Sequence, residues 1–214
     1  MADIYNRSAE EHLKLISKFH KEIIEYKCPT NKGIKDKLGK TIEEYKVETK
    51  KIQRYLQKHK ELSTLETELF LKRAENCINI AENSNYIDLL KRSMTRREIC
   101  IGSNVSLNIG DVNEIRVISL EDCAYDLIEM DGIYYLSKLK RKDIELNFQK
   151  LVKEYCQAEG LGIDSEIFML ALLSYPREFF RCFERYRLNK RSWTEEQFKT
   201  NIEKAFKKDG NSLI

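Results

Sequence analysis

One stretch of the chain, residues 97–126, interrupts a pattern that is otherwise helical. Runs rich in β-branched residues at 98–101, 105–109 and 114–120 surround a turn-forming Gly-Asp-Val-Asn segment. Short runs of this kind on either side of a Gly-Asp turn are typical of a β-hairpin. We therefore expect a mainly α protein, a helical bundle that carries a small β-hairpin insert near residues 98–120.

The other residues place apolar side chains at the spacing of amphipathic helices. The expected helices are 8–26, 41–58, 63–84, a short one around 87–90, 131–140, 143–157, 167–175, 177–188 and one that begins at 194. Capping boxes are expected at Ser8, Thr41, Ser63 and Thr194. No repeat, low-complexity tract or linker interrupts this series, which favours a single domain over residues 1–214.

Two of these segments carry specific expectations about burial. Residues 167–175 are apolar nearly all round, so they are expected to form the helix at the centre of the core. Pro176 ends that helix and suits the first turn of the next one. In the helix from 63, we expect Leu65 and Leu69 to face inward with the small residues that follow.

Composition limits the class of protein. With 214 residues and 42% hydrophobic content, the chain can bury a substantial core. Charged residues make up 34%, yet the formal net charge is only +3, so the charges indicate solvated helix faces. No apolar run approaches the roughly 20 residues of a membrane span, and the start lacks the features of a signal peptide. We expect a cytoplasmic protein that does not enter a membrane.

The six cysteines are widely spread and include no C-x-x-C pair; they are Cys28, Cys77, Cys100, Cys123, Cys156 and Cys182. This spacing favours reduced, buried cysteines over a zinc site assembled from distant positions. His20 shares the apolar stripe of the first helix, where a hydrogen-bonded core histidine is the expectation. We therefore expect no metal and no cofactor.

The segment from Arg177 leans basic, and aromatic residues interleave with its arginines. These aromatics are Tyr175, Phe179, Phe180, Phe183, Tyr186 and Trp193. The combination is compatible with stacking on nucleic-acid bases. However, aromatics at helical spacing after a buried segment favour a place in the core. Nucleic-acid binding is therefore kept as an alternative function.

In order, the expected elements resemble the larger lobe of a kinase. Residues 98–103, followed by Asn108, stand where the aminoglycoside phosphotransferase and choline kinase superfamily has the catalytic loop H-G-D-x-x-x-x-N. Residues 117–121 stand where it has the metal-binding I-D-F-D. Within that superfamily the chain is most similar to the CotS-type spore coat family of spore-forming bacteria. The segments that carry this resemblance, which extends from about Ala9, are KLGK at 37–40, CAYDL at 123–127, LLSYPREF at 172–179 and KRSW at 190–193.

The catalytic positions depart from the pattern of that superfamily. Ser103 stands at the catalytic aspartate, Ser119 at a metal-binding aspartate, and Ile101 at the loop histidine. Asn108 and Glu121 remain, but one carboxylate and one amide make a poor Mg²⁺ site. Phosphoryl transfer needs both an acidic group that orients the nucleophile and a bound metal. The resemblance therefore implies a degenerate site.

The chain also begins where such kinases pass from the small lobe to the large one, without a Gly-rich loop or a strand lysine. We thus expect the large lobe alone, a pseudokinase that acts in binding or assembly, by resemblance in the spore coat. A protein partner or a second copy would cover the surface that the small lobe covers in kinases.

The alternative is a phosphotransferase that takes its small lobe from another chain. Its metal site would be rebuilt from Glu121 and Asn108 with Asp122 or Asp126. A structural role competes for some of these carboxylates, because Asp126 and Asp131 are expected to accept hydrogen bonds that fix the loop or cap a helix.

Overall fold

The computed structural model describes residues 2–24, 34–102, 109–110, 116–117, 119, 121–142 and 144–214. The helices are α1 (Ala2–Ile23), α2 (Lys40–Lys58), α3 (Leu65–Asn83), α4 (Tyr86–Arg96), α6 (Glu129–Lys140), α7 (Phe148–Glu159), α8 (Ile163–Ser174), α9 (Arg177–Arg187) and α10 (Glu195–Asp209), and a 3-10 turn η1 (Lys60–Leu62) joins α2 to α3. The expected mainly α fold with a small β component is confirmed.

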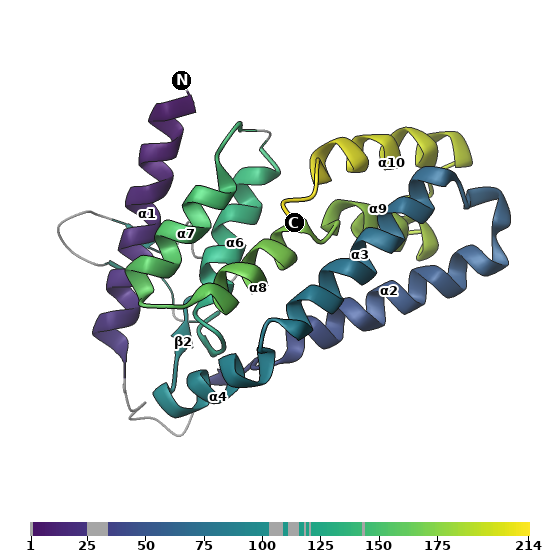
Figure 1. Ribbon diagram of the computed structural model, residues 1–214. Coiled ribbons are helices and arrows are strands. Elements are labelled where there is room, and N and C mark those ends of the chain that lie inside the picture. The colour runs from purple at the N-terminus through teal and green to yellow at the C-terminus, as the bar shows by residue number, and fades with distance from the viewer. Residues whose placement is uncertain are drawn as a thin grey trace.

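The helices form two groups that meet at α8 (Figure 1). One group contains α1, α6 and α7, and the other contains α2, α3, α9 and α10. Helix α8 packs against α3 from one group and against α6 and α7 from the other. No helix in the described part of the chain is long and apolar enough to cross a membrane.

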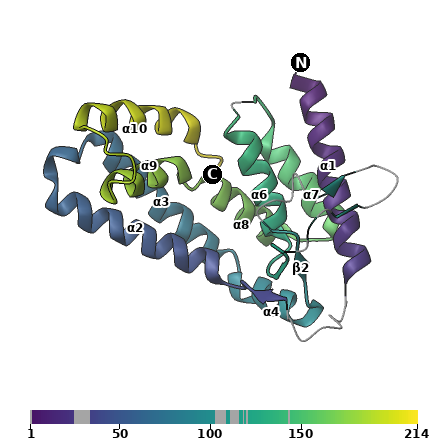
Figure 2. The same cartoon turned by 180° about the vertical axis from the view of Figure 1, so that it is seen from behind.

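The small β component differs in part from the expected hairpin. Strands β3 (Ile109–Gly110) and β4 (Arg116–Val117) pair antiparallel and confirm its centre, and β3 contacts α1 (Figure 2). The run at 98–101 is not part of it: β2 (Ile99–Cys100) pairs instead with β5 (Ala124–Tyr125). Strand β1 (Lys35–Asp36) adds to β5 in parallel, giving the order β1-β5-β2. Strands of two residues are too short to show an alternating sequence pattern.

Of the four expected capping boxes, only the one at Thr194 is confirmed as placed. Thr194 caps α10 together with Gln197, as expected, and α3 is capped by Thr64 with Thr67, one position later than expected. Ser8, however, lies inside α1, and α2 begins after Gly39 with no side-chain cap. Gly39 has a φ of 78°, so its left-handed backbone turns the chain into α2 where a side-chain cap was expected.

Helix α8 is central, although not apolar all round. It begins at Ile163, four residues before the expected start, and Ile163 and Ile167 are exposed. Its other apolar side chains enter one continuous cluster of buried residues that draws on both helix groups. In α3 the buried positions are mostly small, whereas Leu65 and Leu69 are 71% and 56% exposed, against expectation. Small side chains allow α3 to pack closely on α8 and α2, which leaves these leucines on the outer side.

A glycine allows α6 to approach its neighbours closely. A Cβ on Gly132 would lie 2.7 Å from both Met169 Cε in α8 and Tyr155 Cε1 in α7. Real Cβ atoms do not make such contacts, so any larger residue would force α6 away. This close packing brings the first turn of α6 beneath the β elements.

The aromatic residues of the C-terminal segment belong to the core. Tyr175, Phe179, Phe180 and Phe183 are buried, while Tyr186 and Trp193 are partly buried and pack against the same cluster. This confirms the core interpretation of their spacing. The cysteines in the described residues, Cys77, Cys100, Cys123, Cys156 and Cys182, are free and buried as expected, and Cys28 lies outside those residues.

Candidate functional site

The predicted catalytic positions are only partly described. Ser103 and Asn108 lie outside the described residues. Ser119 is half-buried, and its Oγ accepts a hydrogen bond from the Glu121 N–H at 3.3 Å. Glu121 is exposed in the turn at 121–122.

Asp131, in the first turn of α6, holds the base of the loop. Its Oδ2 accepts the N–H of Ile101 at 2.7 Å, and its Oδ1 accepts the N–H of Gly102 at 2.8 Å. The carboxylate is fully buried. The expectation that an acidic side chain after the hairpin fixes the loop is therefore confirmed for Asp131, which clamps the backbone just before Ser103.

Gly102 is required at this clamp for two reasons. Its φ of +93° lies in the left-handed region that side chains disfavour. A Cβ there would also lie only 2.5 Å from the Asp122 carbonyl oxygen. Glycine thus lets the loop base press against the turn at 121–122.

His20 of α1 lies between two carboxylates. Its Nε2 is 3.1 Å from Asp131 Oδ2, and its Nδ1 is 2.7 Å from Glu159 Oε1 in α7. Burial alone would lower the pKa of His20, but the hydrogen bonds to the two carboxylates raise it to about 9. The expected hydrogen-bonded core histidine is confirmed. Its partners lie 111 and 139 positions away, which is why no local sequence signal pointed to them.

Cys100 of β2 completes this buried cluster. Its Sγ donates to the Leu127 carbonyl oxygen at 3.1 Å, and burial raises the pKa of the thiol well above its usual range. The ligand atoms of His20, Cys100 and Asp131 all lie within 4.8 Å of one another. Across the described residues, this is the one group of three or more His, Cys, Asp or Glu side chains placed to hold a metal ion.

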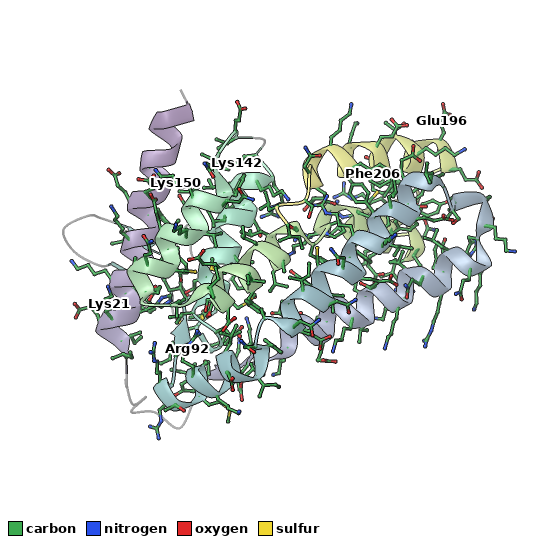
Figure 3. The ribbon with its side chains drawn as sticks, in the orientation of Figure 1. Lys21, Arg92, Lys142, Lys150, Glu196 and Phe206 are labelled. Atoms are coloured by element: carbon green, nitrogen blue, oxygen red, sulfur yellow. The ribbon has the colours of Figure 1, made fainter. Side chains whose placement is uncertain are left out.

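A second, partly buried network centres on Arg92 of α4, which Figure 3 labels. Its guanidinium donates to both oxygens of Glu98, at 2.9 and 3.0 Å, and to both oxygens of Glu129, at 2.8 and 2.7 Å. Ser165 of α8 also donates to Glu129, at 2.6 Å. Burial would lower the pKa of Arg92, but these carboxylates raise it. The network joins α4, α6 and α8 around the strand that leads into the loop.

Asp126 also accepts a hydrogen bond within the protein. Its Oδ1 accepts the N–H of Leu127 at 2.9 Å, and burial raises the pKa of its carboxyl to about 7. Asp126, Asp131 and Glu129 are therefore committed to hydrogen bonds within the protein. Among the described residues, Glu121 belongs to no cluster of three possible ligands, so the described side chains do not fit a Mg²⁺ site of oxygen ligands.

A groove of about 830 Å³ runs between α2 and α9, apart from this cluster. Arg177 and Arg181 line it from α9, and Glu44 and Glu48 from α2. The Arg177 guanidinium lies 5.9 Å from the centre of the Tyr45 ring. Because both signs of charge line the groove, it favours neither an anionic nor a cationic ligand.

The fold and the site thus define a mainly helical protein in which buried charged side chains hold the base of a loop. No family model matches the chain, and no curated protein matches it. The kinase-like resemblance consequently stays a prediction from the sequence.

Proposed function

We propose that this chain is a non-catalytic, kinase-like large lobe that acts in binding or assembly, by resemblance in the spore coat. The observation that carries the proposal is the clamp formed by Asp131. It holds the backbone at Ile101 and Gly102, immediately before the position where the resemblance expects a catalytic aspartate and the sequence has Ser103. A backbone held just before this position, with no acidic residue at the position itself, supports a scaffold that has lost its chemistry.

The state of the neighbouring carboxylates supports the same proposal. Glu98 and Glu129 are paired with Arg92, and Asp126 accepts the N–H of Leu127. Carboxylates held in this way are poorly placed to bind Mg²⁺ at the phosphates of a nucleotide. Glu121 alone supplies too little charge for the alternative, a phosphotransferase that takes its small lobe from another chain.

The aromatic residues that suggested nucleic-acid binding are not available to stack on bases. Stacking on bases needs exposed aromatic rings, whereas Phe179, Phe180 and Phe183 are buried in the core. The basic side chains of α9 are also interspersed with Glu178 and Glu184, which pair with them.

Titration calorimetry with Mg·ATP tests the loss of chemistry. The wild-type chain is expected to give no binding heat, because its site lacks both aspartates. A double variant Ser103→Asp, Ser119→Asp restores them, and the matched control Ser8→Asp, Ser212→Asp adds the same charge at exposed positions. Nucleotide binding by the double variant alone would mark a relic site that is geometrically intact. Tight Mg·ATP binding by the wild-type chain would contradict the proposal.

Sedimentation velocity on the same samples tests the assembly role. By the kinase resemblance, we expect the surface that a small lobe would cover to include the end of α1, next to which Ile24 is exposed. We expect the wild-type chain to self-associate as its concentration rises and Ile24→Glu to weaken this, while Leu69→Glu on the outer side of α3 does not. A chain that stays monomeric, with free amide hydrogen exchange in the hairpin, would rule out self-association through this surface.

A further inference from the structure

Three metal-ligating side chains from distant parts of the chain converge beneath the loop. His20 comes from α1, Cys100 from β2 and Asp131 from α6. Their exposed fractions are 5%, 1% and 0%, so all three lie in the protein interior. A nitrogen, a sulfur and a carboxylate oxygen within 4.8 Å of one another form a donor set that suits zinc.

Neighbouring groups hydrogen-bond to His20 and Asp131 and hold them in place, as the residues around the ligands of a metal site do. Glu159 Oε1 lies 2.7 Å from His20 Nδ1, which directs the opposite ring nitrogen, Nε2, toward Asp131 and Cys100. A carboxylate on the far nitrogen of a histidine is the usual outer contact of a zinc ligand. The backbone N–H groups of Ile101 and Gly102 fix Asp131 in the same way.

The His20 and Asp131 donors already have the spacing of two zinc ligands. His20 Nε2 and Asp131 Oδ2 lie 3.1 Å apart, close to the separation of two ligands bound to one tetrahedral ion with bonds of about 2.0 Å. The Leu127 carbonyl oxygen lies 3.1 Å from Cys100 Sγ and offers an oxygen for a fourth position. A hollow of about 60 Å³ at the α1 edge of the molecule, where Figure 3 shows Lys21, is lined by His20, Glu159 and Lys21.

We propose that His20, Cys100 and Asp131 bind one zinc ion that ties α1 to the base of the loop. On binding, Zn²⁺ takes the place of two protons, one shared between His20 and Asp131 and one from the Cys100 thiol, and both protons leave to solvent. The net charge of the buried cluster is therefore unchanged. The ion links three segments that the chain otherwise joins only through long connections. It acts as a structural staple and is independent of the proposed loss of phosphoryl transfer.

Cobalt(II) is the probe that tests this site directly. The purified chain is stripped with a chelator, reloaded with Co²⁺, and its absorption spectrum recorded. We expect the thiolate-to-cobalt charge-transfer band and the strong visible bands of a tetrahedral ion. Cys100→Ser should lose the charge-transfer band, whereas Cys182→Ser, which removes a different buried thiol in α9, should keep it.

Zinc content and thermal unfolding complete the test. We expect about one tightly held zinc ion per wild-type chain, and a rise in Tm on zinc addition that Cys100→Ser and His20→Asn reduce while Cys182→Ser does not. If wild-type protein gives no thiolate-to-cobalt band, the proposal fails, even where the variants do not fold. Metal that binds equally to wild type and Cys100→Ser also overturns it, because the metal then sits elsewhere.

Discussion

Asp131 shows what a single buried acid does in this protein. Each of its oxygens accepts a backbone N–H, and His20 provides a third partner on Oδ2. A fully buried carboxylate is tolerated only when donors of this kind replace its water. The side chain therefore joins α6, the loop base and α1 at one point.

We predict that Asp131→Asn destabilises the protein by about 3–5 kcal/mol. Asparagine keeps one acceptor oxygen, so its NH₂ group must face one of the two backbone N–H donors, and His20 loses a charged partner. Urea unfolding at neutral pH with a chelator present measures the loss without a contribution from bound metal.

Asp88→Asn is the matched control at the surface of α4. Asp88 pairs with Lys91, at 3.0 Å, and both side chains are exposed. An exposed ion pair of this kind contributes little, so its loss should cost less than about 0.5 kcal/mol. If Asp131→Asn cost no more than this control, Asp131 would not be holding the loop.

The role of some residues can be predicted from the sequence alone, and the role of others cannot. Ser103 and Ser119 could be proposed from their place in a pattern of local spacing. The contacts of His20 with Asp131 and Glu159 could not be predicted in this way. The three residues lie on separate helices, and no sequence period relates them. Leu69 shows the same limit, because its helical spacing is correct while the close packing of small residues decides which face of α3 is buried.

At the scale of elements, α9 depends on another helix for its start. Pro176 precedes α9 and offers no side-chain cap. Instead, Asp209 at the end of α10 accepts the N–H groups of Glu178 and Phe179, at 3.0 and 2.8 Å. Arg73 of α3 donates to the carbonyl oxygens of Ser174 and Asp209 at the same junction. Helix ends with unpaired N–H groups attract acidic side chains in this way.

This cap predicts a pH dependence of stability. Burial raises the pKa of Asp209 from 3.8 to about 6, although its two backbone hydrogen bonds lower it. The folded state thus holds the proton more tightly than the unfolded chain. Wild-type stability should fall by on the order of 2–3 kcal/mol relative to Asp209→Asn as the pH rises from about 4 to about 6.

Urea unfolding midpoints of wild type and Asp209→Asn, measured across that pH range, test whether wild-type stability falls or rises with pH. Taking the difference between them removes the titration of other groups. If wild type instead gained stability relative to Asp209→Asn as the pH rose, the prediction would be wrong. The two N–H donors would then stabilise the charged carboxylate of Asp209 by more than burial destabilises it.

The elements themselves were largely predictable, but their pairing was not. Long amphipathic periods located each helix, although not its ends, because burial of one face imposes that period. Exceptions lie at the ends, as at Ser8, where the helix continues beyond the expected cap. The pairing of β2 with β5 needed the structure, since two-residue strands take their partners from the surrounding helices rather than from their own sequence.

At the scale of the whole molecule, the two helix groups seen in Figure 1 share one cluster of buried apolar residues. Helix α8 contributes to it from both sides, packing on α3 as well as on α6 and α7. The β1-β5-β2 sheet is a second link, because β1 precedes α2 while β2 leads from α4 into the loop. A shared core of this kind predicts that the two groups unfold together.

Trp193, the only tryptophan, makes this cooperativity measurable. It lies between α9 and α10 and packs against the core, so its fluorescence reports on one helix group, whereas far-UV circular dichroism reports on all helices. We predict coincident urea transitions for the two signals. Asp131→Asn, a change in the other group, should shift both midpoints equally. If its circular dichroism midpoint fell while that of Trp193 stayed unchanged, the groups would unfold separately, and the chain would contain two folding units rather than one.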